Sequence, residues 1–460
     1  MITINVGRLA ESLITGGKAT DNPAQEAVRA IIGRVRKDGA AALREYSLQF
    51  DHVAIEQFEV AAPVIEAAHE RLRQEEPALF DALCFAADNI RAFAEFQKTQ
   101  ISSVEREAVP GMFTGQRAIP LDRAAVYVPR GRYPLISTAL MGVIPAVVAG
   151  VREIYVTSAP LADGLPDWRI MAAASLAGAH RIFALGGAHA VAAFAFGVSA
   201  SGGTSGMAGN GEIIPRADII VGPGNKYVAE AKRQLFGETG IEAVAGPTDV
   251  LIIADESASP VLVAADLIAQ AEHDADARAR ALVPDIKLAQ AVKAEAQKQL
   301  ETLPGRETAQ ASLDAGGLLI VYRTKEEAVA AANRIAPEHL ELHVKDPAQW
   351  LPALANYGSV FIGETAAEAL GDYSAGINHT LPTMGYSRFS GGLSVRHFLK
   401  IVTSLRCENG ADIARYLETA KVIAEAEGLY GHARSLDFRL IKTKNSVAHD
   451  TPDCCGGVTA

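Results

Sequence analysis

The sequence predicts an α/β protein with two Rossmann-like parallel-sheet domains and helical segments at its N- and C-terminal ends. Its 460 residues exceed the roughly 250–300 residues that one hydrophobic core supports, so we expect at least two domains. From about residue 119, short apolar strands alternate with helical stretches, which is the pattern of a parallel sheet covered by helices. The alternation occurs as two series, separated near Gly246–Pro247.

The N-terminal segment, residues 1–118, is predicted to be mainly helical. Helical periodicity begins at Pro23, after the N-capping residues Asp21 and Asn22, and it continues through residues 64–96. We expect this segment to pack on the second α/β unit.

The two α/β domains are expected at residues 119–247 and 248–390. Their predicted strands are the apolar segments at 124–129, 153–159, 181–186 and 217–222 in the first domain, and at 249–255, 280–285, 318–324, 339–344 and 359–363 in the second. The Gly- and Ser-rich stretch 200–212 interrupts the first series and indicates a surface excursion or a substrate lid. A helical C-terminal segment, residues 391–445, and a disordered tail, residues 446–460, are expected to follow.

Composition and charge exclude several classes of protein. Hydrophobic residues make up 49% of the chain and the net charge is −11 without a basic stripe, so a nucleic-acid partner is not expected. Apolar stretches such as 135–151 contain Pro and Gly and fall short of a membrane span, and the N-terminus lacks a secretory signal pattern. The cysteines form no CxxC pair, which favours a reducing, cytoplasmic location; they are Cys84, Cys407, Cys454 and Cys455.

Two glycine turns indicate a cofactor site in the first domain. GPGNKY, residues 222–227, follows a predicted strand and opens a helix, which is the setting in which a phosphate binds a helix N-terminus. LGGAHA, residues 185–190, has the same setting. Such glycines also serve plain tight turns, but two of them at strand ends favour a ligand crevice.

Polar residues of the second domain suggest a metal site with catalytic groups. Gln270 and His273 are spaced i and i+3 near a helix end, and Asp372 lies in a Gly-rich loop after the last strand. With a further histidine, such nitrogen and oxygen donors suit Zn²⁺, although a lone histidine on a helix is more often structural. Glu338 and His339 begin a predicted strand, where they form either an acid–base pair or an ordinary solvated strand edge.

These segments, in this order, resemble the histidinol dehydrogenase family. The resemblance covers roughly residues 20–440 and is carried, among others, by LGGAHAVAAFAFG, IIVGPGNKYVAEAKRQLFG, AADLIAQAEHDADA, RIAPEHLEL, GINHTLPT and AEAEGLYGHARS. It implies an NAD-dependent zinc alcohol dehydrogenase of histidine biosynthesis that acts as a homodimer. Its small-molecule substrate, L-histidinol, is then oxidised through the aldehyde to L-histidine in two hydride transfers.

The resemblance assigns a role to each matching residue. One zinc ion per subunit is bound by Gln270, His273, Asp372 and His432, the last reaching the site from the partner subunit. The implied catalytic residues are Glu338, which activates water against the aldehyde, and His339, which removes the hydroxyl proton. The implied cofactor contacts are Tyr127, His189 and Asn225, and the implied substrate contacts are Thr248, His379 and Glu427.

Several positions depart from the family pattern. His189 replaces the usual glutamine, Thr248 replaces the usual serine, and PRGRYPLIST places Arg130 and Arg132 beside the cofactor loop. In one interpretation the arginines are surface residues or contacts to NAD phosphates; in the other, Arg132 helps to bind an anionic substrate. Several segments also resemble the sulfopropanediol dehydrogenases, so oxidation of another small alcohol, such as an anionic diol, is the alternative.

Overall fold

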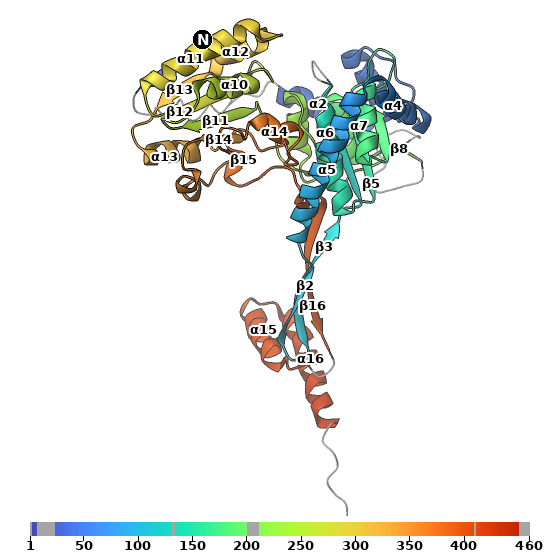
Figure 1. The fold of residues 1–460 in the computed structure, drawn as a ribbon. Helices are drawn as coiled ribbons and strands as arrows, with labels where there is room; N and C mark the ends of the chain where they lie inside the picture. The colour runs from blue at the N-terminus through green and yellow to red at the C-terminus, as the bar shows by residue number, and fades with distance from the viewer. Residues whose placement is uncertain (1, 7–23, 131–133, 200–210, 409–410, 450–460) are drawn as a thin grey trace, which may run out of the picture. The chain divides into compact units, whose positions relative to one another are not determined.

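The computed structural model describes residues 2–6, 24–130, 134–199, 211–408 and 411–449, which divide into two compact units (Figure 1). Unit 1 combines Met1–Lys98 with Pro120–Phe398, and unit 2 combines Thr99–Ile119 with Leu399–Ala460. Unit 1 contains two separate parallel sheets with helices against them, so the predicted α/β class is confirmed. Among the described residues, no helix combines the length and the apolarity that crossing a bilayer requires.

The larger sheet of unit 1 has six parallel strands. Their order is β1 (Thr3–Val6), β13 (Leu318–Val321), β12 (Arg278–Val283), β11 (Asp249–Ala254), β14 (His339–His343) and β15 (Ser359–Ile362). Alternate residues of β11 enter two different apolar cores, Val250 and Ile252 on one face and Leu251 and Ile253 on the other. The first core is closed by α10 (Pro260–Ala271), α11 (Ile286–Thr302) and α12 (Arg306–Gly316), and the second by α13 (Lys325–Ile335). A strand buried on both faces requires such a continuous apolar run.

The smaller sheet has five parallel strands, and its strand order reverses once. The order is β10 (Gly240–Ile241), β9 (Ile219–Val221), β4 (Arg123–Tyr127), β5 (Glu153–Ser158) and β6 (Arg181–Ala184). Its helices are α6 (Ile136–Ala149), α7 (Trp168–Ala177), α8 (Gly187–Phe196) and α9 (Lys226–Leu235). After β6 the chain returns to the other side of β4, so the order reverses between β4 and β9. Such a reversal opens a crevice at the carboxyl ends of parallel strands, where ligands commonly bind.

The described part of the N-terminal segment is helical over most of residues 24–99, whereas residues 3–6, 104–109 and 112–118 form strands where helix was expected. Most of these helices pack elsewhere than expected. The helices are α2 (Ala24–Asp38), α3 (Ala40–Tyr46), a π-helix η1 (Ser47–Asp51), α4 (Ala62–Glu75) and α5 (Pro77–Thr99). The expectation of packing on the second α/β unit is wrong for α2, which packs on α8 and α9, and for α4, which packs on α7. The alanine-rich surfaces of α7 and α8 allow this close approach. Contacts with the larger sheet's layer are made by β1, through β13, and by Asn89 of α5, which donates to the Ser374 carbonyl at 3.0 Å.

Unit 2 mixes a small sheet with two helices. The strands β16 (Leu399–Cys407), β3 (Met112–Pro120) and β2 (Val104–Val109) lie side by side in that order, and α15 (Ala414–Ala426) packs against α16 (Tyr430–His449). The strand at 399–407 corrects the expectation of a wholly helical C-terminal segment, because the β-branched run in LKIVTSLRC favours extended backbone. Residues 446–449 continue α16, where a disordered tail was expected.

The remaining elements of the described residues are short. They are β7 (Val198–Ser199), β8 (Glu212–Ile214), α14 (Glu368–Tyr373) and the 3₁₀ helices η2 (Pro347–Gln349), η3 (Leu351–Ala353), η4 (Tyr386–Arg388) and η5 (Val395–Phe398). Of the predicted excursion at 200–212, residues 200–210 lie outside the described part of the chain.

Candidate active site

The amino ends of two adjacent strands in the larger sheet bring the predicted catalytic residues together. β11 and β14 pair in parallel, with Val250 opposite His339. Thr248 immediately precedes β11, and Glu338 immediately precedes β14. Because both strands begin at the same edge of the sheet, the residues before them lie within contact distance.

Glu338 is held through one carboxylate oxygen. Its Oε2 accepts from the Thr248 hydroxyl at 2.5 Å and from the Asp249 backbone N–H at 3.0 Å. The Glu338 backbone N–H donates to Asp249 Oδ1 at 3.2 Å, and Asp249 Oδ2 accepts from Arg280 at 2.5 Å. Burial raises the pKa of Glu338 well above its usual range, and the Thr248 hydrogen bond acts in the opposite direction. The carboxyl group is therefore fixed in position by a buried polar network.

His339 is buried, and neither of its ring nitrogens has a hydrogen-bond partner within the described structure. Nδ1 lies 3.8 Å from Glu368 Oε1 and 3.9 Å from Glu338 Oε2, and Nε2 lies 3.8 Å from Asp372 Oδ1. Burial, together with the charge of His273, lowers the pKa of His339 to about 3. The imidazole is therefore neutral near pH 7, and a neutral imidazole has a lone pair that can take a proton.

Three of the predicted metal ligands lie close together. Gln270 and His273 stand at the end of α10 and just beyond it, and Asp372 lies on α14. His273 Nε2 is 3.9 Å from Asp372 Oδ2, and donor atoms of His273, Asp372 and Glu368 all lie within 4.8 Å of one another. Two ligands of a tetrahedral zinc ion, each about 2.0–2.2 Å from it, lie roughly 3.4 Å apart. The donor set and its spacing therefore fit a zinc ion.

The side-chain amide of Gln270 connects this donor set with Glu338. It lies 2.6 Å from Thr248 Oγ1, the hydroxyl that also contacts Glu338. Its other amide atom lies 2.7 and 2.9 Å from the two carboxylate oxygens of Glu368. Burial, and after it the charge of Asp372, raises the pKa of Glu368 well above its usual range. One chain of polar contacts thus joins the predicted metal ligands and the predicted base.

His379 links this region to the helices of the smaller sheet. Its Nδ1 donates to the Asp372 carbonyl at 3.0 Å, and its Nε2 lies 3.2 Å from the Thr138 hydroxyl on α6. Because a carbonyl oxygen can only accept, the ring proton stands on Nδ1 and Nε2 accepts from Thr138. Burial lowers the pKa of His379, which agrees with a neutral ring. This predicted substrate contact therefore lies directly beside a predicted metal ligand.

Tyr127 stands where the strand order of the smaller sheet reverses. It ends β4, and its hydroxyl accepts from the backbone N–H of Gly187, in the LGGAHA turn, at 3.0 Å. In the GPGNKY turn, a Cβ on Gly222 would lie 2.1 Å from the Tyr127 carbonyl oxygen, and the φ of Gly222 is 113°. Only glycine fits there. Both glycine turns thus meet at Tyr127, at the kind of strand-order reversal where parallel sheets commonly bind ligands.

The other two predicted cofactor contacts, Asn225 and His189, lie at the starts of α9 and α8. Asn225 caps α9, its side-chain oxygen accepting from the backbone N–H groups of Tyr227 at 3.0 Å and Val228 at 3.2 Å. His189 lies in the first turn of α8, buried near the rings of Tyr46 and Phe50, and burial lowers its pKa to about 4. Their cofactor roles stay predictions.

Some predicted site residues are not brought to this edge of the larger sheet. Glu427 and His432 are exposed and belong to unit 2, at the end of α15 and the start of α16, so their roles stay predictions. Arg132 lies outside the described residues. Arg130 donates to the Pro160 carbonyl at 2.6 Å, a contact within its own layer of unit 1.

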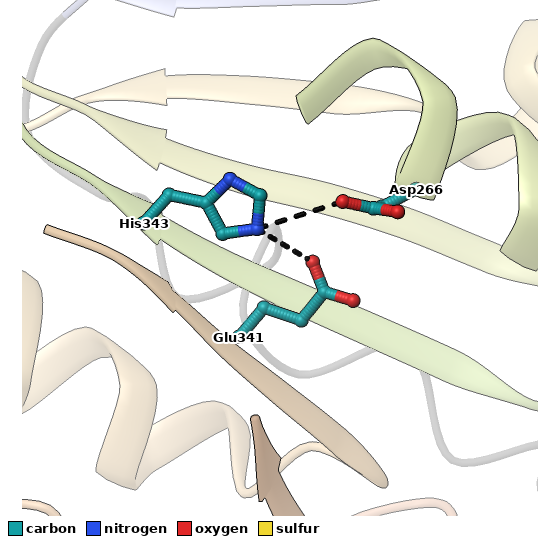
Figure 2. A group of neighbouring side chains, drawn as sticks. All are labelled: Asp266, Glu341 and His343. Carbon is teal, nitrogen blue, oxygen red and sulfur yellow. Dashed lines mark hydrogen bonds and ion pairs between the residues drawn. The ribbon is translucent and has the colours of Figure 1, made fainter. Parts of the chain in front are cut away.

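Four buried or half-buried titratable residues near the site were not predicted. They are Asp266, Glu341, His343 and Glu368, and Figure 2 shows the first three pointing toward one another. Their spacing is the one signal of them in the sequence. Asp266 and Glu368 precede Gln270 and Asp372 by four residues on the same helices, and Glu341 and His343 follow His339 at strand spacing.

Comparison with known proteins places this geometry in a family. Residues 15–440 match the family model described as histidinol dehydrogenase. The chain belongs to the histidinol dehydrogenase family. It is 46% identical to histidinol dehydrogenase of Thermus thermophilus, over 92% of this chain and 96% of that protein. It is 42% identical to a histidinol dehydrogenase homolog of Ruegeria pomeroyi, over 93% of this chain and 95% of the relative.

A solved structure supports the same assignment. The crystal structure of histidinol dehydrogenase from Elizabethkingia anophelis superposes with a TM-score of 0.87 at 32% sequence identity, covering 96% of this chain and 99% of that one. The resemblance inferred from the ordered motifs is confirmed, and the family identifies the chain as an oxidoreductase.

Proposed function

We propose that this enzyme oxidises L-histidinol to L-histidine with NAD and zinc, in the cytoplasm, as a step of histidine biosynthesis. The observation that carries the proposal is the position of His339. An unpartnered, buried imidazole lies beside Glu338 and within 3.8 Å of Asp372, a residue of the zinc-compatible donor set. Buried polar atoms without partners are rare in native proteins and here indicate a missing ligand. The names of the similar proteins supply the choice of alcohol.

Zinc is held by Gln270, His273 and Asp372, with His432 of a second copy as the fourth ligand in a homodimer. The ion supplies a fixed anchor for the polar groups of the substrate and polarises them. Glu427 of the second copy, together with Thr248 and His379, contacts the substrate. Binding the alcohol in the orientation required for reaction can raise the rate by several orders of magnitude.

The two catalytic residues divide the proton transfers between them. His339 accepts the hydroxyl proton as the alcohol loses a hydride and becomes an aldehyde. Glu338 then takes a proton from water, which adds to the aldehyde to give a hydrate. Because Thr248 and Asp249 both donate to Oε2, the contact with water falls to Oε1. Loss of a second hydride and of a proton converts the hydrate to the carboxylic acid, which releases a further proton to give the carboxylate.

NAD, when bound, accepts the hydride of each step, so two molecules are consumed per histidinol. Its proposed site is at Tyr127, between the two glycine turns of the smaller sheet. The positive ends of the α8 and α9 helix dipoles favour phosphate there. Retaining the aldehyde between the two steps protects it from side reactions in solution.

The test combines a substrate panel with one variant. NADH formation is measured with L-histidinol and with anionic diols, before and after removal of zinc by a chelator. We expect turnover with histidinol that disappears on chelation and returns with zinc. His339→Asn should lower kcat by about 10²–10⁴-fold with an unchanged zinc content, because a general base is removed and no ligand is lost.

His52→Asn is the matched control, since His52 is exposed and its φ of 61° suits asparagine. It should leave turnover unchanged. Robust turnover of an anionic diol without turnover of histidinol would refute the proposed substrate. Full activity of His339→Asn would refute the role given to that residue.

A further inference from the structure

Asp266, Glu341 and His343 form a buried cluster next to the candidate site (Figure 2). His343 Nε2 lies 3.1 Å from Glu341 Oε2 and 3.5 Å from Asp266 Oδ2. The side chains of Glu341 and His343 are 0% and 1% exposed, and that of Asp266 is 13% exposed. Carboxylates are seldom buried unless a partner compensates for lost hydration, so the imidazole between them ties α10 to β14.

Each member of the cluster stands on an element that also carries a site residue. Asp266 lies one helical turn before Gln270 on α10. Glu341 and His343 follow His339 on the same face of β14. The cluster therefore joins α10, which carries the predicted metal ligand Gln270, to β14, which carries the proposed base His339.

A third element is attached through the other oxygen of Glu341. Glu341 Oε1 accepts from the Glu368 backbone N–H at 3.1 Å. Glu368 is the first residue of α14, and Asp372 lies one turn further along this helix. With six residues, α14 has little helical stability of its own, so the place of Asp372 depends on contacts such as this one.

We infer that Asp266, Glu341 and His343 are positioning residues that fix α10, β14 and α14 relative to one another and so set the geometry of the metal ligands. This inference rests on the zinc site of the proposed function. Residues that orient the ligands of a metal typically change metal affinity or activity by about 10–100-fold when replaced. None of the three needs to touch metal, substrate or NAD to act in this way.

Glu341→Ala tests the inference most directly, because it removes both the nearer partner of His343 and the acceptor for the Glu368 N–H. Zinc affinity of the full-length enzyme is measured by competition with a chromophoric chelator. We expect binding about 10–100-fold weaker than in the unaltered enzyme, and a lower kcat at saturating zinc. Glu341→Gln should recover most of the affinity, since its amide oxygen still accepts from Glu368 and its nitrogen faces His343.

Two further variants keep the result interpretable. Asp266→Ala removes the partly exposed carboxylate of the cluster, so it tests the connection to α10 without leaving a cavity in the apolar core. We expect several-fold weaker zinc binding. Tyr322→Phe is the control, because it deletes a buried hydrogen bond to the Ala254 carbonyl at the edge of the same sheet. It should lower the unfolding midpoint while zinc affinity stays unchanged.

Three results would overturn the inference. Glu341→Ala and Asp266→Ala with unaltered zinc affinity would make the cluster merely structural, while leaving the proposed function intact. Two zinc ions per unaltered chain, one of them lost in Glu341→Ala, would make the cluster a metal site itself. An unaltered enzyme that binds no zinc would overturn the proposed zinc site together with the inference.

Discussion

Breaking the buried ion pair between Asp249 and Arg280, next to Glu338, should lower the stability of the protein by an amount that follows from the structure. Asp249 and Arg280 are 2.5 Å apart, and their side chains are 7% and 6% exposed. Asp249 also accepts the Glu338 backbone N–H. Removing one partner of a buried pair costs about 3–5 kcal/mol, because the other charge remains without compensation. Arg280→Met should therefore lower the free energy of unfolding by an amount in this range.

Replacing both partners should cost much less. In Asp249→Leu/Arg280→Met no buried charge is left unpaired, so the remaining loss is the acceptor for the Glu338 N–H, about 1–3 kcal/mol. Arg280→Met should also lower turnover, because the unpaired Asp249 carboxylate raises the pKa of Glu338 further. The double variant should regain part of the lost turnover.

The assay is urea unfolding followed by tryptophan fluorescence. The chain has two tryptophans, Trp168 on α7 and Trp350 in a core of the larger sheet. In a Trp168→Phe background, the signal of Trp350 reports on the sheet that contains the pair. Arg73→Met, which breaks an exposed pair with Glu70, is the control and should change stability far less. A double variant as unstable as Arg280→Met, or a single variant as stable as the control, would refute this reasoning.

Two further predictions concern the smaller sheet. His189 has a folded-state pKa of about 4, so below pH 6.5 the unfolded chain binds a proton that the folded one does not. The free energy of unfolding therefore decreases as the pH falls from 6.5 toward 4, by about 2 kcal/mol at pH 5. His189→Gln should make the difference in unfolding free energy between pH 7 and pH 5, measured in urea, smaller by this amount. An unchanged difference would contradict the burial of a neutral ring. Tyr127→Phe leaves the Gly187 N–H without its acceptor, which should lower stability by about 1–3 kcal/mol. If NAD binds there, its KM should rise more than kcat falls, whereas a change in the KM of histidinol alone would place Tyr127 in another role.

The fold class was predictable because it depends on local patterns. Continuous apolar runs such as residues 250–254 are typical of strands buried on both faces, and the glycine turns mark the strand-to-helix junctions. The packing of α2 and α4 was not predictable, because an apolar helix face fits any small-residue surface of suitable shape. The strand at 399–407 was missed because a short β-branched run between helical stretches has no period of its own.

The candidate site was predictable only in part. Residues such as Gln270 and Glu338 were found because ordered motifs point to them. Glu368 and Asp266 were missed, because a carboxylate four residues before another polar residue occurs on many solvated helices. Only burial against His339 and His343 gives these carboxylates a meaning, and burial is a property of the tertiary structure.

The predicted site residues lie at opposite strand ends in the two sheets. In the smaller sheet, Tyr127 lies at the carboxyl end of β4, where a strand-order reversal favours a nucleotide. In the larger sheet, Thr248 and Glu338 lie at the amino ends of their strands. α6 starts from the carboxyl edge of the smaller sheet, and its first turn carries Thr138, which contacts His379 beside Asp372. In the proposed function, this junction is where the hydride acceptor and the alcohol would meet, each held by a different sheet.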